Sequence, residues 1–60
     1  MRITINMLVG SAHHKQLIKK IEYADKNGKQ AIWNHDGKWM NVVDAYRCGG
    51  TNYLGVVLEC

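Results

Sequence analysis

The side chains best suited to chemistry in this chain are three histidines and two cysteines, His13, His14, His35, Cys48 and Cys60. A structural zinc site takes four such ligands, usually as two close pairs. The only close pair is His13 with His14, and neighbouring residues of a helix point about 100° apart, so they cannot easily hold one ion. The sequence therefore predicts no metal site, and no pattern in it indicates a cofactor.

Catalysis requires a nucleophile or a base that a partner side chain holds in place. His35 and Asp36 are adjacent, but they lie in a turn signal, where little could exclude water. Asp44 could act with His14 only if the fold brought the two together. A chain of 60 residues also has little room for both a pocket and the residues that support it. We therefore predict that the protein is not an enzyme.

The segment after Gly10 predicts a helix start with features that attract anions. Ser11, His13, His14 and Lys15 would gather there around free backbone N–H groups. The second glycine and the Lys-Ser/Thr pair of a phosphate-binding loop are missing, however. A serine cap followed by solvated histidines is the simpler interpretation, and a phosphate or nucleic-acid contact is the alternative.

Three lysines recur along the same predicted helix, and we call Lys15, Lys19 and Lys26 the lysine ridge. At about 100° per residue they project from one side of the helix, and such an array could contact a phosphate backbone. Glu22 lies within the ridge and can pair with Lys19 and Lys26, which is typical of a solvated outer face. The net charge of +3 permits nucleic-acid binding without requiring it. Nucleic-acid binding through the ridge and the helix start is therefore the alternative function.

The elements that must position these residues follow from the hydrophobic pattern. Residues 2–9 alternate apolar and polar side chains, which predicts a strand with one buried face. From Ala12 the period becomes helical, with Ser11 as N-cap and Asn27-Gly28 as the stop. The apolar stripe of this helix comprises His14, Leu17, Ile18, Ile21 and Ala24.

The dipeptide Asp36-Gly37 predicts a two-residue hairpin turn between a strand over residues 30–34 and a second strand that begins near Trp39. In that register the side chains of Trp33, Met40, Ala31 and Val42 share the core face. The opposite face carries Ile32, Asn34, Trp39 and Asn41, which we call the hairpin face.

The hairpin face is the predicted partner-binding surface. A tryptophan beside an isoleucine, with asparagines around them, is typical of an interface hot spot with a polar rim. The alternative is that a second helix or the last strand buries Trp39 in a two-sided core. The sequence leaves these two interpretations open.

Residues 41–50 admit two structures. Asn41 as a cap, Asp44 at the third position and Gly49-Gly50 at the end favour a short helix over residues 41–48. Alternatively, the strand continues to Arg47 with a bulge at Asp44. The near-continuous apolar run over residues 53–59 then predicts a central strand covered on both faces.

The predicted fold is a single α+β domain over residues 1–60. A small, mostly antiparallel sheet of three or four strands carries one amphipathic helix on a face, in the order strand, helix, strand, strand, short helix, strand. Cys48 and Cys60 could form at most one disulfide bond, and without a secretory signal free thiols in the cytoplasm are the simpler interpretation. No segment is long and apolar enough to predict a membrane span.

These observations predict a small interaction protein that binds a protein partner through the hairpin face and inhibits or regulates it. A domain this small often needs extra support, so self-association as a homodimer is also expected. Small stand-alone proteins that begin at their own methionine often serve as inhibitors, antitoxins or regulators, including in phages and mobile elements.

Overall fold

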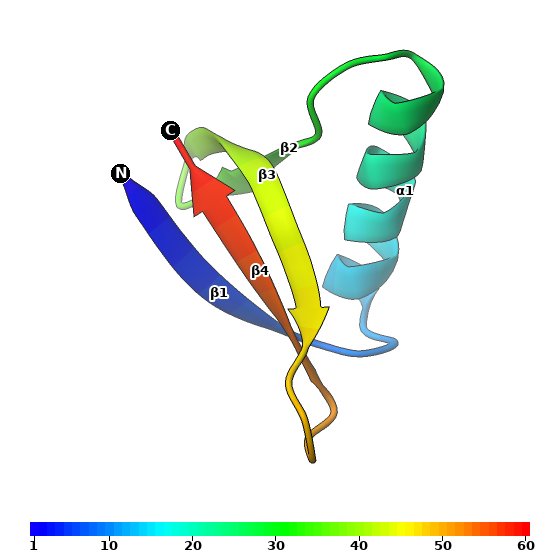
Figure 1. The fold of residues 1–60 in the computed structure, drawn as a ribbon, viewed down its shortest axis with the longest axis vertical. Helices are drawn as coiled ribbons and strands as arrows, with labels where there is room; N and C mark the ends of the chain where they lie inside the picture. Colours follow the sequence, from blue (N-terminus) through cyan, green and yellow to red (C-terminus); the bar gives the residue numbers. More distant parts are fainter.

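The computed structural model describes residues 1–60 as one helix and four strands (Figure 1). The elements follow the chain in the order β1 (Arg2–Leu8), α1 (Ala12–Lys26), β2 (Ile32–His35), β3 (Lys38–Arg47) and β4 (Tyr53–Glu59). All neighbouring strands pair antiparallel in one sheet of order β1-β4-β3-β2. The predicted α+β class, with one helix packed on a small antiparallel sheet, is therefore confirmed.

The helix begins and ends where its capping residues predict. The Ser11 hydroxyl accepts a hydrogen bond from the His14 backbone N–H at 3.3 Å, and Asn27 is the C-cap. Gly28 follows with φ of 63°, a conformation that glycine adopts without steric cost. The predicted apolar stripe is narrower than expected, because Ile18 is 40% exposed while Leu17 is only 1% exposed.

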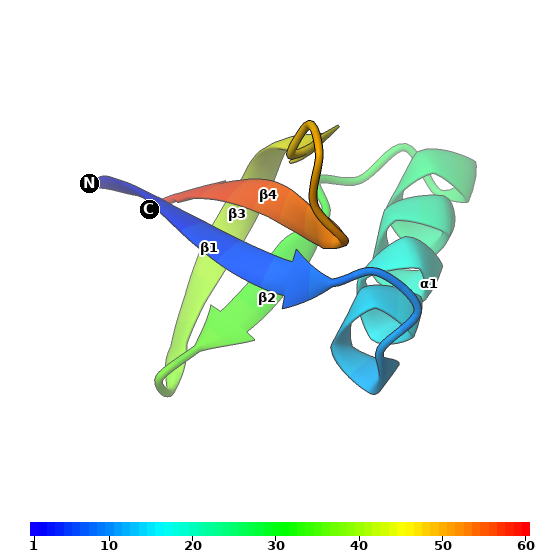
Figure 2. The same ribbon diagram turned by 90° about the horizontal axis from the view of Figure 1, so that it is seen from below.

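Helix α1 contacts β1 and β2, the two strands at the edges of the sheet. Figure 2 shows that all four strands lie on one side of the helix and that the sheet curls toward it. The core therefore lies between the concave face of the sheet and one flank of the helix. Its buried members are Met7, Leu17, Trp33, Met40, Val42, Val56 and Leu58.

The β2–β3 hairpin has the predicted turn and register. Asp36 and Gly37 have φ values of 50° and 79°, as a tight two-residue turn requires. Trp33 pairs with Met40 and both are buried, which places the core face of the hairpin where the sequence predicts it.

The predicted short helix over residues 41–48 is wrong, because β3 continues without interruption to Arg47. The register with β4 shifts between Val42 and Asp44, so the bulge of the alternative interpretation is present. A helix starting at Asn41 would pull Val42 out of the core and away from its partner Leu58. The two glycines that suggested a helix end belong instead to the β3–β4 turn.

β4 occupies a central position, as predicted, but it is covered on one face only. Val56 and Leu58 are fully buried against the helix side, whereas Val57 is half-buried and Tyr53 is exposed on the other face. The expectation of cover on both faces is therefore wrong, since no second layer lies on the convex side of the sheet (Figure 2).

The ring of Tyr46 covers Gly55 on this convex face. Tyr46 and Gly55 are cross-strand partners, and a Cβ added at Gly55 would lie 2.5 Å from the Tyr46 ring. Glycine thus allows the tyrosine to lie flat against the backbone of β4, an arrangement that stabilises an otherwise weak strand position.

We expect Gly55→Ala to lower the free energy of unfolding by about 1 kcal/mol, because the added methyl group displaces the ring of Tyr46. In a Tyr46→Ala background the same change should be neutral or stabilising, since alanine then meets open space and suits a strand better than glycine. A double-mutant cycle with urea unfolding measures this coupling. Equal costs of Gly55→Ala in both backgrounds would contradict it.

Candidate partner-binding surface

The hairpin face lies on the convex side of the sheet and is open to solvent. Ile32, Asn34, Trp39 and Asn41 are all exposed, and Trp39 is 55% exposed. The register places Ile32 opposite Asn41 and Asn34 opposite Trp39, so the four side chains form one block. The structure therefore brings together all the predicted partner-binding residues and leaves Trp39 outside the core.

Lys20 of α1 contacts one side of the exposed Trp39 ring. The Lys20 ammonium group lies 5.3 Å from the centroid of the Trp39 ring, within range of a cation–π interaction. Lys20, Gln16, Trp33, Asn34 and Trp39 together line a shallow hollow of about 240 Å³. The hairpin face thus continues around the edge strand β2 onto the helix.

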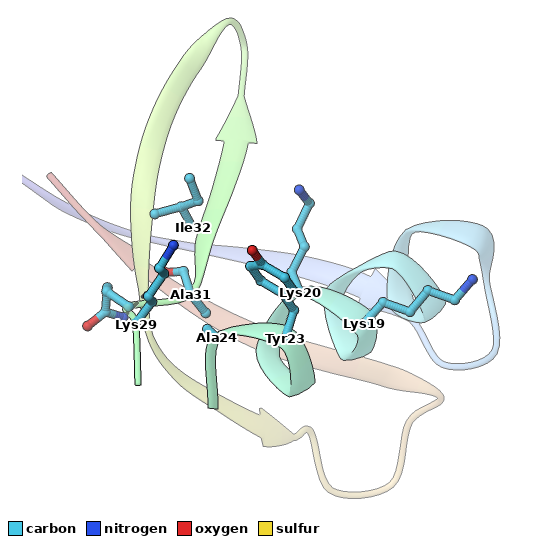
Figure 3. Close-up of a pocket in the computed structure, with 8 residues that line it drawn as sticks. Lys19, Lys20, Tyr23, Ala24, Lys29, Ala31 and Ile32 are labelled. Carbon is cyan, nitrogen blue, oxygen red and sulfur yellow. Dashed lines mark hydrogen bonds between the residues drawn. The ribbon is translucent and has the colours of Figure 1, made fainter. Parts of the chain in front are cut away.

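A larger groove lies beside this hollow, between the C-terminal half of α1 and the chain that enters β2 (Figure 3). Its volume is about 490 Å³, and Lys20 lines both depressions. We call it the α1–β2 groove, lined by Lys19, Lys20, Tyr23, Ala24, Lys29, Gln30, Ala31 and Ile32. Sequence reasoning missed this groove because its two walls are brought together only by the packing of α1 against β2.

The predicted anion site at the helix start is occupied by contacts within the chain. Ser11 accepts a hydrogen bond from the His14 N–H, and His14 Nδ1 accepts one from the Gly10 N–H at 2.9 Å. The His13 ring packs edge-on against Trp33, with centroids 6.1 Å apart. The serine cap of the simpler interpretation is therefore present, but His13 and His14 each make a contact within the chain instead of being only solvated.

The lysine ridge is exposed along its whole length. Lys15, Lys19 and Lys26 all lie on the solvent side of α1, and none has a carboxylate oxygen within 4.0 Å. The ridge residues differ in location, because Lys19 borders the α1–β2 groove whereas Lys15 and Lys26 do not.

Two histidines that are distant in sequence meet in a third hollow, of about 320 Å³. His13 comes from the helix start and His35 from the hairpin tip, where His35 Nε2 lies 3.5 Å from an Asp36 carboxylate oxygen. No group of three or more potential metal ligands is formed in the chain. Asp44 lies on the convex side of β3 beside Val57, so the sheet separates it from His14.

The two cysteines lie at opposite ends of β4. The Cys48 N–H donates a hydrogen bond to the Tyr53 carbonyl at one end, and Cys60 follows Glu59 at the other. Seven residues of strand separate them, roughly 20 Å at about 3.3 Å per residue. A disulfide needs Cα atoms within about 7 Å, so this geometry excludes a bond within one chain.

Comparison with known proteins identifies no relative of this chain. The chain matches no protein-family model, no curated protein and no solved structure. The single helix is also too short and too polar to cross a membrane. Function must therefore be argued from the surface itself.

Proposed function

We propose that this protein is a small non-enzymatic interaction module that binds a protein partner through the hairpin face and inhibits or regulates it in the cytoplasm. The observation that carries this proposal is the exposure of Trp39, more than half of which is open to solvent on the convex face of the sheet. Tryptophan is the residue type most enriched at the centres of interfaces, and asparagines suit a polar rim.

The position of Trp39 supports a role outside the core. Trp33, on the other face of the same hairpin, is buried in the core, whereas Trp39 is not part of the core cluster. Exposed Ile32 extends the apolar area next to it, and Lys20 restricts one side of the ring. A side chain that is already restricted loses less entropy when a partner binds it.

Nucleic-acid binding remains the second candidate, and the lysines without carboxylate partners favour it. One observation counts against it, because the helix start is capped by its own side chains. A binding surface for a phosphate backbone needs several free cations in line, and only the lysine ridge offers them, since Arg2 on the convex face is paired with Glu59 at 2.6 Å.

We expect Trp39→Ala to weaken partner capture at least about tenfold, because loss of a hot-spot side chain typically costs 2 kcal/mol or more. The measurement is quantitative affinity capture from the native host, followed by titration of the captured partner. Tyr53→Ala is the matched control, since Tyr53 is a similarly exposed aromatic residue on the same convex face at the far end of the sheet. Light scattering on both variants tests whether the partner is a second copy. Equal capture by wild type and Trp39→Ala would contradict the proposal.

A further inference from the structure

The α1–β2 groove has an apolar floor between cationic side chains. Tyr23, Ala24, Ala31 and Ile32 contribute its hydrophobic surface, and the side chains of Tyr23 and Ile32 are exposed. Figure 3 shows Tyr23, Lys20 and Ile32 extending to the same side of the groove. Exposed apolar side chains around a hollow are suited to receive an apolar side chain of a ligand.

The charges around the groove are all of one sign. Lys20 on the helix and Lys29 on the entering chain lie on opposite walls, and no aspartate or glutamate lines the groove. Neither lysine has a carboxylate oxygen within 4.0 Å. The ammonium group of Lys19 extends along the helix away from the other two (Figure 3). The groove is therefore complementary to an occupant with acidic groups on both sides of an apolar one.

One wall of the groove ends at Ile32, the first residue of β2, and β2 is an open edge of the sheet. Val42 N–H donates to Ala31 C=O at 2.9 Å, which fixes the alternation of the hairpin ladder. Ala31, Trp33 and His35 therefore bond toward β3, and the backbone groups of Ile32 and Asn34 point away from it. An extended peptide can bind such an edge by main-chain hydrogen bonds, which a nucleic acid cannot supply in this pattern.

From these observations we infer that the α1–β2 groove docks an extended acidic segment of the protein partner. The segment would place an apolar side chain against Tyr23 and Ile32, and carboxylates near Lys20 and Lys29. This inference rests on the proposed function and names the chemistry of the partner. Trp39 would contact the same partner beyond the end of the segment, since Lys20 borders both surfaces.

The test is an NMR titration of amide shifts in the whole protein with a short, end-blocked peptide of alternating glutamate and valine. We expect the amides of Ile32 and Asn34 to shift, with weak affinity typical of one short segment. Matched probes are the same peptide with lysine for glutamate, the same peptide with serine for valine, and a single-stranded DNA oligonucleotide of equal negative charge. Both control peptides and the DNA should bind at least about fivefold more weakly.

The matched variants are Lys20→Gln/Lys29→Gln at the groove and Lys15→Gln/Lys26→Gln on the exposed ridge, which have equal net charge. The groove variant should lose about fivefold or more in affinity for the acidic peptide, and the ridge variant should lose little. Equal losses in both variants, tighter binding of DNA, or no shift of Ile32 and Asn34 at millimolar peptide would each overturn the inference. The proposed function fails separately, when Trp39→Ala leaves partner capture unchanged.

Discussion

Trp33→Ala is expected to lower the free energy of unfolding by about 3–5 kcal/mol, because it removes the largest side chain of the core. A domain of this length typically has about 3–9 kcal/mol in total. Trp33 is 8% exposed and packs between the helix start and Met40 on β3. A loss of this size removes from about a third to all of that stability, so the variant should be strongly destabilised at room temperature.

Trp39→Ala is the matched control, since it removes the same side chain from the opposite face of the same hairpin. We expect it to cost less than about 1 kcal/mol, the value of a cation–π contact at an exposed site. Urea unfolding measures the stability of the two variants. Far-UV circular dichroism is the suitable signal, because each variant lacks one of the two tryptophans and their fluorescence is not comparable. Similar losses of stability in the two variants would contradict the assignment of Trp33 to the core and Trp39 to the surface.

Leu17→Ala is expected to lower the free energy of unfolding by about 2–5 kcal/mol. Leu17 and Ala24 are the only buried residues of α1, and Leu17 is by far the larger. A helix of 15 residues is only marginally stable on its own in water. The burial of Leu17 therefore supplies much of the free energy that keeps α1 folded and packed on the sheet. Loss of helical signal in circular dichroism should accompany the loss of stability.

The adjacent Ile18→Ala provides the control. Ile18 is 40% exposed on the flank of the helix. Removing the same number of side-chain carbon atoms there should lower the free energy of unfolding by less than about 1 kcal/mol. Alanine also has the higher helix propensity, which offsets part of that loss. If the Ile18 variant were as unstable as the Leu17 variant, the helix would pack in a different rotation from the one described.

Local signals predicted much of the fold. The alternation in β1, the Ser11 cap, the Asn27-Gly28 stop and the Asp36-Gly37 turn each depend on neighbouring residues, and the structure retains each of them. The register of the β2–β3 hairpin also followed, because a two-residue turn leaves only one pairing of its strands. These elements could be predicted because the forces that specify them act within a few residues.

Residues 41–48 could not be assigned in the same way. Their capping pattern is a genuine helix signal, but it is weaker than the burial of Val42 and the pairing of β3 with β4 over six positions. That pairing is made with the next strand, across the connection formed by residues 48–52, so the capping pattern within residues 41–48 carries no sign of it. The bulge allows β3 to contain a polar residue at this point. Asp44 faces solvent on the convex side of the sheet, while Val42 and Ala45 lie on the side of the sheet that faces the helix.

The candidate site was predicted only in part. The hairpin face followed from the alternation of one hairpin, but the exposure of Trp39 depended on whether a second helix would cover it. The α1–β2 groove could not be predicted, because it depends on how α1 packs against β2. No pattern around Lys29 in the sequence indicated that this residue would line a groove. A surface formed between two elements is therefore the part of the candidate site that could not be predicted from the sequence.

The central strand of the sheet is also the last strand of the chain. β1 pairs with β4 alone, and Cys60 N–H donates to Met1 C=O at 3.1 Å, so the two ends of the chain must meet before the first strand has any partner. Strands β2, β3 and β4 are consecutive and pair with one another across short turns, so they can form three quarters of the sheet without β1. Closing the long loop that brings β1 to β4 costs additional entropy. We therefore expect β1 to be the last strand to join the sheet, and the two ends of the chain to be the last parts to meet.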